Sequence, residues 1–258
     1  MFLEQLFGLK GKVALVIGGG GVLAGAMAEG LAKAGADVAI FDLNYQNAEK
    51  QAEKLKQFGV KALAIGGDAT SATDLRAALT QNLKTFGQVD ILINAPGLNS
   101  ATPVFEITEQ EWHKLLDVNL KSMFLACQIV GKQMIDQGRG GSIINISSAS
   151  SGPPLSKVFT YSISKAGVNN LTQFLAREWA PYRVRVNAIA PGFFPAEQNR
   201  KLLTKERTEA IFRHTPMNRF GEPEELVGAT IWLASEKASS FVTGAIIRVD
   251  GGFTAMTI

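Results

Sequence analysis

The feature that most constrains the fold is a regular alternation of short, β-branched apolar runs with longer segments of helical periodicity. The apolar runs are "KVALVI", "ADVAIF", "VKALAI", "DILIN", "GSIINIS", "VRVNAIA" and "AIIRVD". The helical segments are 22–34, 45–57, 71–86, 108–135, 159–180 and 222–234. Apolar strands separated by amphipathic helices are typical of a parallel sheet covered on both faces. The sequence therefore predicts an α/β fold, a doubly wound parallel sheet of about seven strands.

No Pro/Gly/Ser linker and no internal repeat interrupts this alternation, so we expect one domain over residues 1–258. The longest segment outside this alternation, 193–221, follows an apolar run and contains many charged residues. Such folds place substrate lids at the carboxyl ends of their strands. We therefore expect segment 193–221 to be a lid.

Composition excludes several classes of function. The 26 basic and 23 acidic residues form no Lys/Arg block, which argues against a nucleic-acid partner. The longest uncharged run, 13–28, is too short for a membrane span and is rich in glycine. Cys127 is the one cysteine and cannot form an internal disulfide, which favours a cytoplasmic location. No cluster has metal-ligand spacing, so no metal is expected.

A glycine-rich elbow, "VIGGGGVLAGAMA" at 16–28, joins the first apolar run to the first helical segment. One register, G-x-G-x-x-G/A, uses Gly19, Gly21 and Ala24, whereas the T-G-x-x-x-G-x-G register begins at Gly18. A strand that turns sharply into a helix offers backbone N–H groups and the positive helix end to an anion. The elbow therefore predicts a phosphate site, and an ordinary strand–helix turn is the alternative.

Asp42 ends the second apolar run, 21 residues after Gly21. A carboxylate there accepts hydrogen bonds from both ribose hydroxyls of an adenosine and repels a 2′-phosphate. Asp42 thus favours NAD over NADP, although an aspartate at this point also suits a simple turn.

The candidate catalytic group lies around the fifth apolar run. Ser148 follows that run, Tyr161 comes thirteen residues later, and Lys165 is at i+4 from Tyr161, on the same helix face. A nearby ammonium and a network of ribose hydroxyls are expected to lower the pKa of the phenol, so that Tyr161 can act as a general acid or base. Asn119 lies on a predicted helix, and Asn94 ends the fourth apolar run.

These motifs together resemble the short-chain dehydrogenase/reductase family over essentially the whole chain. The resemblance implies a Rossmann fold, a homotetramer, and a tetrad of Asn119, Ser148, Tyr161 and Lys165. It implies hydride transfer between nicotinamide C4 and a carbinol or carbonyl carbon, with proton exchange at Tyr161. The implied cofactor-binding residues are Gly18, Gly20, Gly21, Val22, Leu23, Asp42, Leu43, Asp68, Ala69, Asn94, Ala95, Pro96, Tyr161, Lys165, Pro191, Gly192 and Phe194.

The chain departs from the family pattern at Ile17, Val22, Ala24, Ala95 and Ala196, each of which removes a hydroxyl, an amide or backbone room near the cofactor. The register that begins at Gly18 is the one the other motifs select. In this register Ala24 raises the question of how closely a pyrophosphate can approach.

Within the family, "GGGGVL", "PGFFP" and "EQNR" resemble the D-mannonate oxidoreductase (fructuronate reductase) branch. This resemblance implies a sugar-acid or polyol substrate, with Arg200 as a partner for a carboxylate. The candidate substrate residues are Asn99, Ser150, Lys157, Gln198, Asn199 and Arg200. The alternatives are a 3-oxoacyl carrier-protein reductase and a nucleotide-binding protein of the same fold without turnover.

Overall fold

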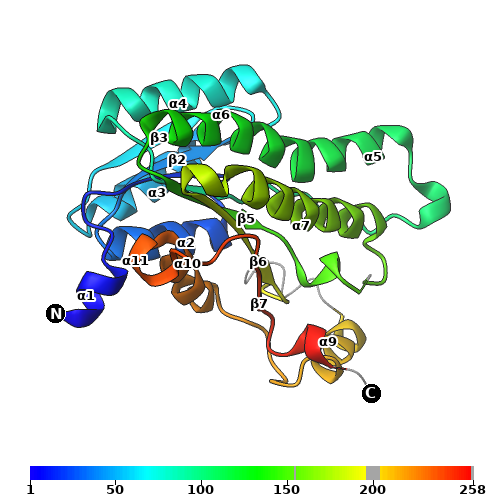
Figure 1. Cartoon of the computed structure of the whole chain (residues 1–258). Helices are drawn as coiled ribbons and strands as arrows, with labels where there is room; N and C mark the ends of the chain where they lie inside the picture. Colours follow the sequence, from blue (N-terminus) through cyan, green and yellow to red (C-terminus); the bar gives the residue numbers. More distant parts are fainter. Residues whose placement is uncertain (154, 196–203, 257–258) are drawn as a thin grey trace.

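Seven strands form one parallel sheet in the order β3-β2-β1-β4-β5-β6-β7 in a computed structural model, which describes residues 1–153, 155–195 and 204–256 (Figure 1). The strands are β1 (Val13–Ile17), β2 (Asp37–Asp42), β3 (Ala62–Gly66), β4 (Ile91–Asn94), β5 (Gly141–Ile146), β6 (Val184–Pro191) and β7 (Ile246–Val249). Every pair of neighbours runs parallel. The predicted doubly wound sheet is confirmed.

Helices connect the strands close to the predicted bounds. They are α1 (Phe2–Phe7), α2 (Val22–Lys33), α3 (Tyr45–Lys56), α4 (Ala72–Phe86), α5 (Glu109–Leu116), α6 (Ser122–Gln137), α7 (Phe159–Trp179), α9 (Lys205–Arg213), α10 (Val227–Ala234) and α11 (Glu236–Ser239). Within the described parts of the chain, no helix is long and apolar enough to span a membrane.

Local polar residues fix where several helices begin. The side chains of Asn44, Ser71 and Thr108 accept hydrogen bonds from backbone amides three residues later and so cap α3, α4 and α5. Gly87 and Gly138 end α4 and α6 in the left-handed conformation that glycine adopts without strain. These signals explain why the sequence pattern located the helices closely.

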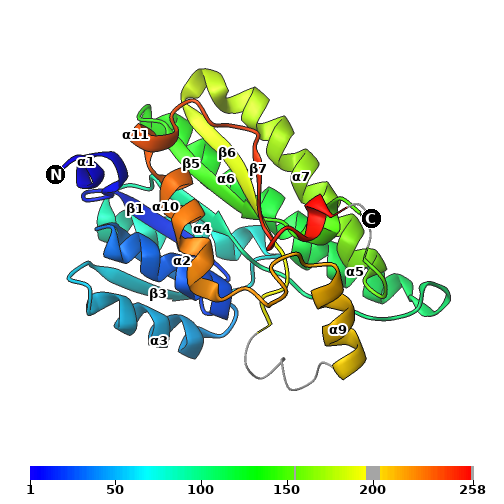
Figure 2. The same ribbon diagram turned by 90° about the horizontal axis from the view of Figure 1, so that it is seen from below.

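Two apolar layers hold the helices on the sheet. Ala14 and Val16 of β1 face the layer under α2, α3 and α10, whereas Leu15 and Ile17 face the layer under α4, α6 and α7. This alternation follows from the two-residue period of a strand. Figures 1 and 2 show the two groups of helices on opposite sides of the sheet. The inner strands are therefore buried on both faces, as their continuous apolar character predicts, whereas the edge strands β3 and β7 are buried only in part.

The chain reverses its direction of winding between β1 and β4, which are neighbours although β2 and β3 separate them in sequence. In such sheets a crevice forms beyond the carboxyl ends of the strands at this point. The turns after β1, β4 and β5 all lie at this edge and carry the predicted site residues Gly18, Pro96 and Ser148.

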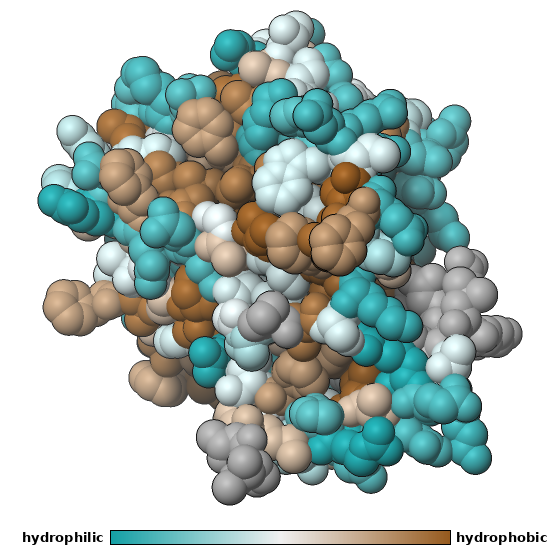
Figure 3. Space-filling model, turned by 90° about the vertical axis from the view of Figure 1, so that its right-hand side faces the viewer, coloured by the Kyte–Doolittle hydropathy of each residue, from teal (hydrophilic) through white to brown (hydrophobic). Residues whose placement is uncertain are grey.

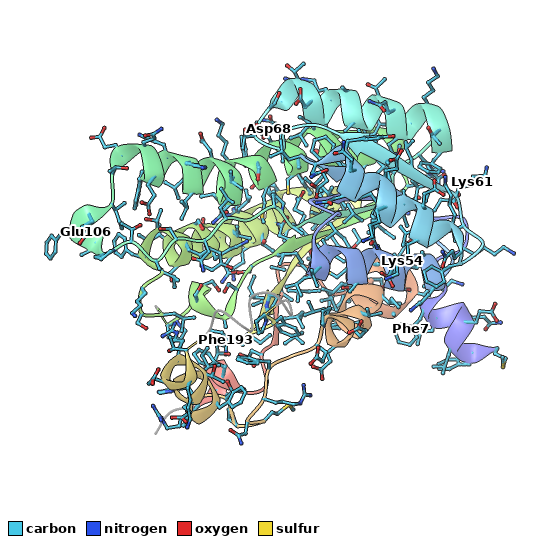
Figure 4. All side chains as sticks on the ribbon, turned by 180° about the vertical axis from the view of Figure 1, so that it is seen from behind. Phe7, Lys54, Lys61, Asp68, Glu106 and Phe193 are labelled. Carbon is cyan, nitrogen blue, oxygen red and sulfur yellow. The ribbon has the colours of Figure 1, made fainter. Side chains whose placement is uncertain are left out.

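Segment 193–221 begins directly beyond β6 and contains α9. Phe193 packs edge-on against Phe253 at 5.2 Å between ring centroids, and Phe212 packs against Phe220 at 4.8 Å. Figure 4 shows the labelled Phe193 beside α9. The start of the predicted lid is therefore packed against the C-terminal segment of the chain at Phe253.

Candidate active site

The glycine elbow after β1 contacts the turn after β4. Gly18 has a φ of +74°, and a Cβ there would lie 3.1 Å from the Pro96 backbone nitrogen. A Cβ on Gly20 would lie 2.7 Å from Asn47 Cβ and 2.9 Å from Asp42 Oδ2. Gly18 is favoured by its positive φ and by the close turn after β4, and a side chain on Gly20 would overlap Asp42 and Asn47. This geometry agrees with the register that begins at Gly18.

Helix α2 begins at the elbow with its backbone amides available. Its N-cap is Gly21, no side chain caps it, and its first turn holds no acidic residue. The first amides of a helix have no partner within it, and they face the crevice together with the positive end of the dipole. Val22, the first residue of α2, is 56% exposed. The elbow therefore fits the diphosphate of a dinucleotide.

Ala24 does not narrow this elbow. Its side chain is 3% exposed and belongs to the apolar layer between α2 and the sheet. The third glycine of such motifs serves close packing of helix on strand, and here a methyl group fills that position. The concern about pyrophosphate approach therefore does not arise from the Ala24 side chain.

Asp42 ends β2 with its carboxylate turned toward the elbow. Oδ2 accepts a hydrogen bond from the Gly20 amide and Oδ1 accepts one from the Asn44 amide, each at 3.0 Å. A carboxylate oxygen has two lone pairs, so each oxygen can also accept a ribose hydroxyl. No ion pair between described residues neutralises its charge. The adjoining Leu43 is 77% exposed and offers no cation to a phosphate.

Asp68 and Ala69 follow β3 at the same edge of the sheet, and Figure 4 shows Asp68 near the start of α4. Asp68 Oδ1 accepts hydrogen bonds at 2.8 Å from the amide and the hydroxyl of Thr70. The Asp68 amide donates to Asp74 at 2.9 Å. The turn is thus held by its own side chains, and the exposed Asp68 keeps its second oxygen available to a ligand.

The Asn94 side chain lies between the neighbouring strand β5 and helix α6. Its amide nitrogen donates to Asn145 Oδ1 at 2.9 Å and to Cys127 Sγ at 3.2 Å, and the residue is fully buried. Burial raises the pKa of the Cys127 thiol to about 12, so this cysteine is a structural thiol and not a nucleophile. A contact from Asn94, Ala95 or Pro96 to a cofactor would therefore use the backbone of Asn94 and the turn that follows it.

Asn119 lies in a five-residue π-helical segment, η2 (Asp117–Lys121), between α5 and α6. The sequence predicts one regular helix over 108–135, and the π turn is a correction to it. Asn119 Oδ1 accepts from the Leu98 amide at 2.7 Å, while its amide donates to the Leu98 carbonyl at 2.8 Å and to Ser164 Oγ at 3.1 Å. A π turn rotates the residues around it, and such turns are frequent at functional sites. Asn119 is thereby directed to the turn after β4.

Two neighbouring serines follow β5, and the structure separates their roles. Ser147 is 2% exposed and donates its hydroxyl to Asn169 Oδ1 at 2.6 Å. Ser148 is half-buried, accepts from the Ser150 amide and hydroxyl at 3.2 and 3.1 Å, and hydrogen-bonds the Tyr161 phenol. The geometry therefore favours Ser148 as the catalytic serine. The predicted substrate residue Ser150 is buried and donates hydrogen bonds to Ser148.

Tyr161 and Lys165 lie one turn apart on α7, with Lys165 Nζ 5.7 Å from the centroid of the Tyr161 ring. Lys165 is 3% exposed and donates to the Ile146 carbonyl at 2.7 Å. A Cβ on Gly97 would lie 3.8 Å from Lys165 Nζ and 3.9 Å from Asn119 Oδ1. The four residues of the implied tetrad therefore meet at one place, beyond the ends of β4 and β5.

The pKa values of this pair differ from the sequence-based expectation. Burial raises the pKa of Tyr161 above its ordinary value, although the hydrogen bond with Ser148 lowers it in part. Burial lowers the pKa of Lys165 to about 7. Because desolvation disfavours both the phenolate and the ammonium, the pKa of Tyr161 in the ligand-free chain stays above its ordinary value despite the contribution of Ser148.

The buried Lys165 leads to a stability prediction. Lys165→Met should stabilise the ligand-free fold, and the gain should shrink as pH rises from 7 to 9. In this window the unfolded chain, with a lysine pKa of about 10.4, binds more protons than the folded protein, so wild-type stability rises with pH. The expected slope of the difference is on the order of 1 kcal/mol per pH unit. Urea unfolding of both proteins at pH 7, 8 and 9 measures it, and a constant difference would contradict it.

The predicted nicotinamide side of the crevice lies beyond β6. Pro191 ends the strand, and a Cβ on Gly192 would lie 2.7 Å from Asp250 Cα. Phe194 is partly buried against the apolar layer under α2 and α10, and a Cβ on Gly221 would overlap its ring. Close contacts on both sides thus fix the start of the lid.

A cavity of about 380 Å³ lies beyond the ends of β6 and β7, and no tetrad residue lines it. Phe193, Phe194, Arg248 and Gly252 contribute to its wall. Arg219, which also lines the cavity, donates two hydrogen bonds to the Glu225 carboxylate, at 2.8 and 2.6 Å. The cavity therefore borders the start of the lid and not the reacting centre.

The candidate substrate residues divide into two groups. Asn99 and Lys157 are exposed, and Lys157 adopts a φ of +68°. Gln198, Asn199 and Arg200, together with Ala196, lie outside the described residues. Among the residues that are described, no group of His, Cys, Asp or Glu side chains forms a metal site.

Comparison with known proteins agrees with this geometry. A family model described as enoyl-(acyl carrier protein) reductase matches residues 21–254. The chain is 38% identical over 250 residues to 2-dehydro-3-deoxy-D-gluconate 5-dehydrogenase from Dickeya dadantii, covering 96% of this chain and 98% of that protein. The chain belongs to the short-chain dehydrogenase/reductase family, and it is an oxidoreductase that acts on a CH–OH group.

Two solved structures resemble the chain along its length. Gluconate 5-dehydrogenase from Burkholderia cenocepacia, in complex with NADP and tartrate, gives a TM-score of 0.93 at 35% identity and covers 98% of this chain and 99% of its own. A proposed D-mannonate oxidoreductase from Haemophilus influenza, with bound NAD, gives a TM-score of 0.93 at 35% identity and covers 100% and 99%. Structures of this family thus contain either nicotinamide cofactor.

Proposed function

We propose that this protein is an NAD-dependent oxidoreductase that interconverts the hydroxyl and carbonyl forms of a sugar acid or polyol, with D-mannonate/D-fructuronate as the preferred pair. The observation that carries the proposal is the convergence of Asn119, Ser148, Tyr161 and Lys165 at the end of β5, beside a glycine elbow that fits a dinucleotide. The sugar-acid relatives support the substrate class.

The chain's residues divide the work of the reaction. When bound, the nicotinamide supplies or accepts the hydride at C4. Tyr161 exchanges a proton with the substrate oxygen, and Ser148, which already hydrogen-bonds the phenol, holds that oxygen in place. Lys165 lies behind the Tyr161 ring and binds the ribose. Asn119 holds the turn after β4 in place and connects it to Ser164 on α7.

Asp42 carries the proposed preference for NAD. Its carboxylate is held at the elbow by two backbone amides, at the position where an adenosine ribose is bound in such folds. A 2′-phosphate would meet this negative charge, with no lysine or arginine among the elbow residues Gly18, Gly20 and Gly21 to offset it. The Burkholderia relative was solved in complex with NADP, so NADPH is included in the experiment as the alternative cofactor.

A substrate panel tests the proposal. NADH absorbance is followed with D-fructuronate, 5-keto-D-gluconate, neutral ketoses and a 3-oxoacyl thioester, each with NADH and with NADPH. We expect turnover of sugar acids with NADH, fastest with D-fructuronate. Turnover of the thioester with NADPH alone would instead support a 3-oxoacyl carrier-protein reductase. NAD(H) binding without any turnover would support a nucleotide-binding protein of this fold.

Exposed apolar side chains on α6 and α7 support a proposed homotetramer. Phe124 is 42% exposed and Phe174 is 58% exposed, and both lie on helices that cover one face of the sheet. Figure 3 shows further apolar residues gathered on the end of the molecule near α5 and α9. Light scattering after size exclusion should give four times the chain mass of 27.6 kDa. A single-chain mass at micromolar concentration would contradict the assembly.

A further inference from the structure

Arg207 of the lid helix α9 reaches the loop that leads to the catalytic helix. Its Nη1 donates to Ser156 Oγ at 2.9 Å, and Ser156 lies five residues before Tyr161. Arg207 is half-buried, and Ile211, one turn later on the same face, is 4% exposed. In Figures 1 and 2, α9 lies beside the loop that precedes α7. Arg207 therefore lies against this loop, and its contact with Ser156 stays accessible to solvent.

No carboxylate among the described residues forms an ion pair with this guanidinium, although α9 carries two glutamates. Glu209 pairs with Lys205 at 4.0 Å. Glu206 is hydrogen-bonded to its own backbone amide and to Thr204, which lowers its pKa. Among the described residues the guanidinium of Arg207 has one hydrogen-bond partner, the Ser156 hydroxyl, and its remaining donors can bind an anion.

The surroundings of Arg207 add positive potential. Between Ser147 and Ser164 the sequence has one charged residue, Lys157, which directly follows Ser156 and is exposed. Helix α7 begins with no side-chain cap and no acidic residue in its first turn, so its positive end is also uncompensated. Thr160 in that turn is 3% exposed, and its hydroxyl has no hydrogen-bond partner.

From these contacts we infer that Arg207, positioned by Ser156 and assisted by Lys157, binds the carboxylate of the substrate. The inference rests on the proposed function, because it requires an acid as substrate. A sugar acid holds its carboxylate several carbon atoms from the carbon that reacts, so its cation must lie beside the tetrad and not within it. Arg207 meets this requirement, since the loop that holds it continues directly into Tyr161.

The test compares Arg207→Gln with Arg213→Gln, a change on the same helix at an exposed position. Tartrate, a hydroxylated dicarboxylate, serves as the probe in calorimetry with NADH present, because the reduced cofactor cannot accept a hydride from it. A charge-assisted hydrogen bond predicts that Arg207→Gln weakens tartrate binding and raises KM for the sugar acid 10- to 100-fold. Values of kcat and of NADH affinity should stay within threefold. Ser156→Ala should give a smaller rise in KM, because the variant keeps the guanidinium and loses only its hydrogen bond to Ser156 Oγ.

The possible failures are distinguishable. If the wild-type protein turns over sugar acids and Arg207→Gln matches Arg213→Gln, the carboxylate site is wrong and the proposed function stands. If the wild-type protein turns over no acid and binds no tartrate, both fail. If Arg207→Gln raises KM equally for a sugar acid and a neutral ketose, Arg207 merely holds the lid, and the inference is overturned. Melting temperatures within 2 °C of wild type, the shift expected for about 1 kcal/mol in a chain of this length, establish that each variant is folded.

Discussion

Tyr161→Phe should lower kcat by about 10²- to 10⁴-fold while leaving NADH affinity within about threefold. The substitution removes only the hydroxyl that hydrogen-bonds Ser148 and exchanges the proton with the substrate. The ring and its neighbour Lys165, whose ammonium donates to the Ile146 carbonyl, stay in place. The loss should therefore appear in the chemical step and not in binding. Steady-state kinetics and fluorescence titration with NADH measure the two quantities.

Tyr182→Phe is the matched control, because this tyrosine is 53% exposed just beyond the end of α7. It should retain wild-type turnover. If Tyr161→Phe keeps more than a tenth of the wild-type kcat, another group delivers the proton and the proposed role of the tetrad is wrong.

Exchanging the charge at the end of β2 should reverse the cofactor preference. The double change Asp42→Ser with Leu43→Arg removes a carboxylate that would face a 2′-phosphate and supplies a guanidinium beside it. Leu43 is 77% exposed, so an arginine fits there without repacking. A charge-assisted hydrogen bond contributes about 1.5–3 kcal/mol, so the Kd ratio for NADPH over NADH should fall by about 100-fold. Titration of both cofactors into wild type and variant measures the ratio.

Asp37→Asn provides the control for net charge. Asp37 begins the same strand at its opposite end, where it accepts a hydrogen bond from the Lys61 amide at 2.8 Å. This change removes one negative charge far from the elbow and should leave the ratio unchanged. If the Kd ratio does not change in the double variant, Asp42 only stabilises the turn, through its hydrogen bonds with the Gly20 and Asn44 amides.

The sequence pattern predicts the architecture closely because the apolar period is strong throughout. The expected helix at 159–180 corresponds to α7 (Phe159–Trp179), and the expected strands correspond to a single seven-stranded sheet. The i, i+4 spacing of Tyr161 and Lys165 also places them correctly, because helix geometry fixes that relation.

Features that depend on tertiary contacts are not predictable in this way. The π turn around Asn119 interrupts a segment with unbroken helical periodicity, and its register depends on hydrogen bonds to Leu98 and Ser164. In the ligand-free chain the pKa of Tyr161 is raised and not lowered, because spacing reveals the neighbouring cation but not the burial of both groups. The contact of Arg207 with Ser156 joins residues 51 positions apart, and no local motif marks it.

Isotope transfer tests the central claim most directly. A sugar acid carrying deuterium on the carbon to be oxidised is incubated with NAD and the protein, and the mass of the NADH is determined. The proposed function predicts one deuterium in each NADH formed with the wild-type protein, and a rate reduced by at least about 100-fold with Tyr161→Phe. Binding of NAD with no transfer of deuterium from any sugar acid in the panel would contradict it.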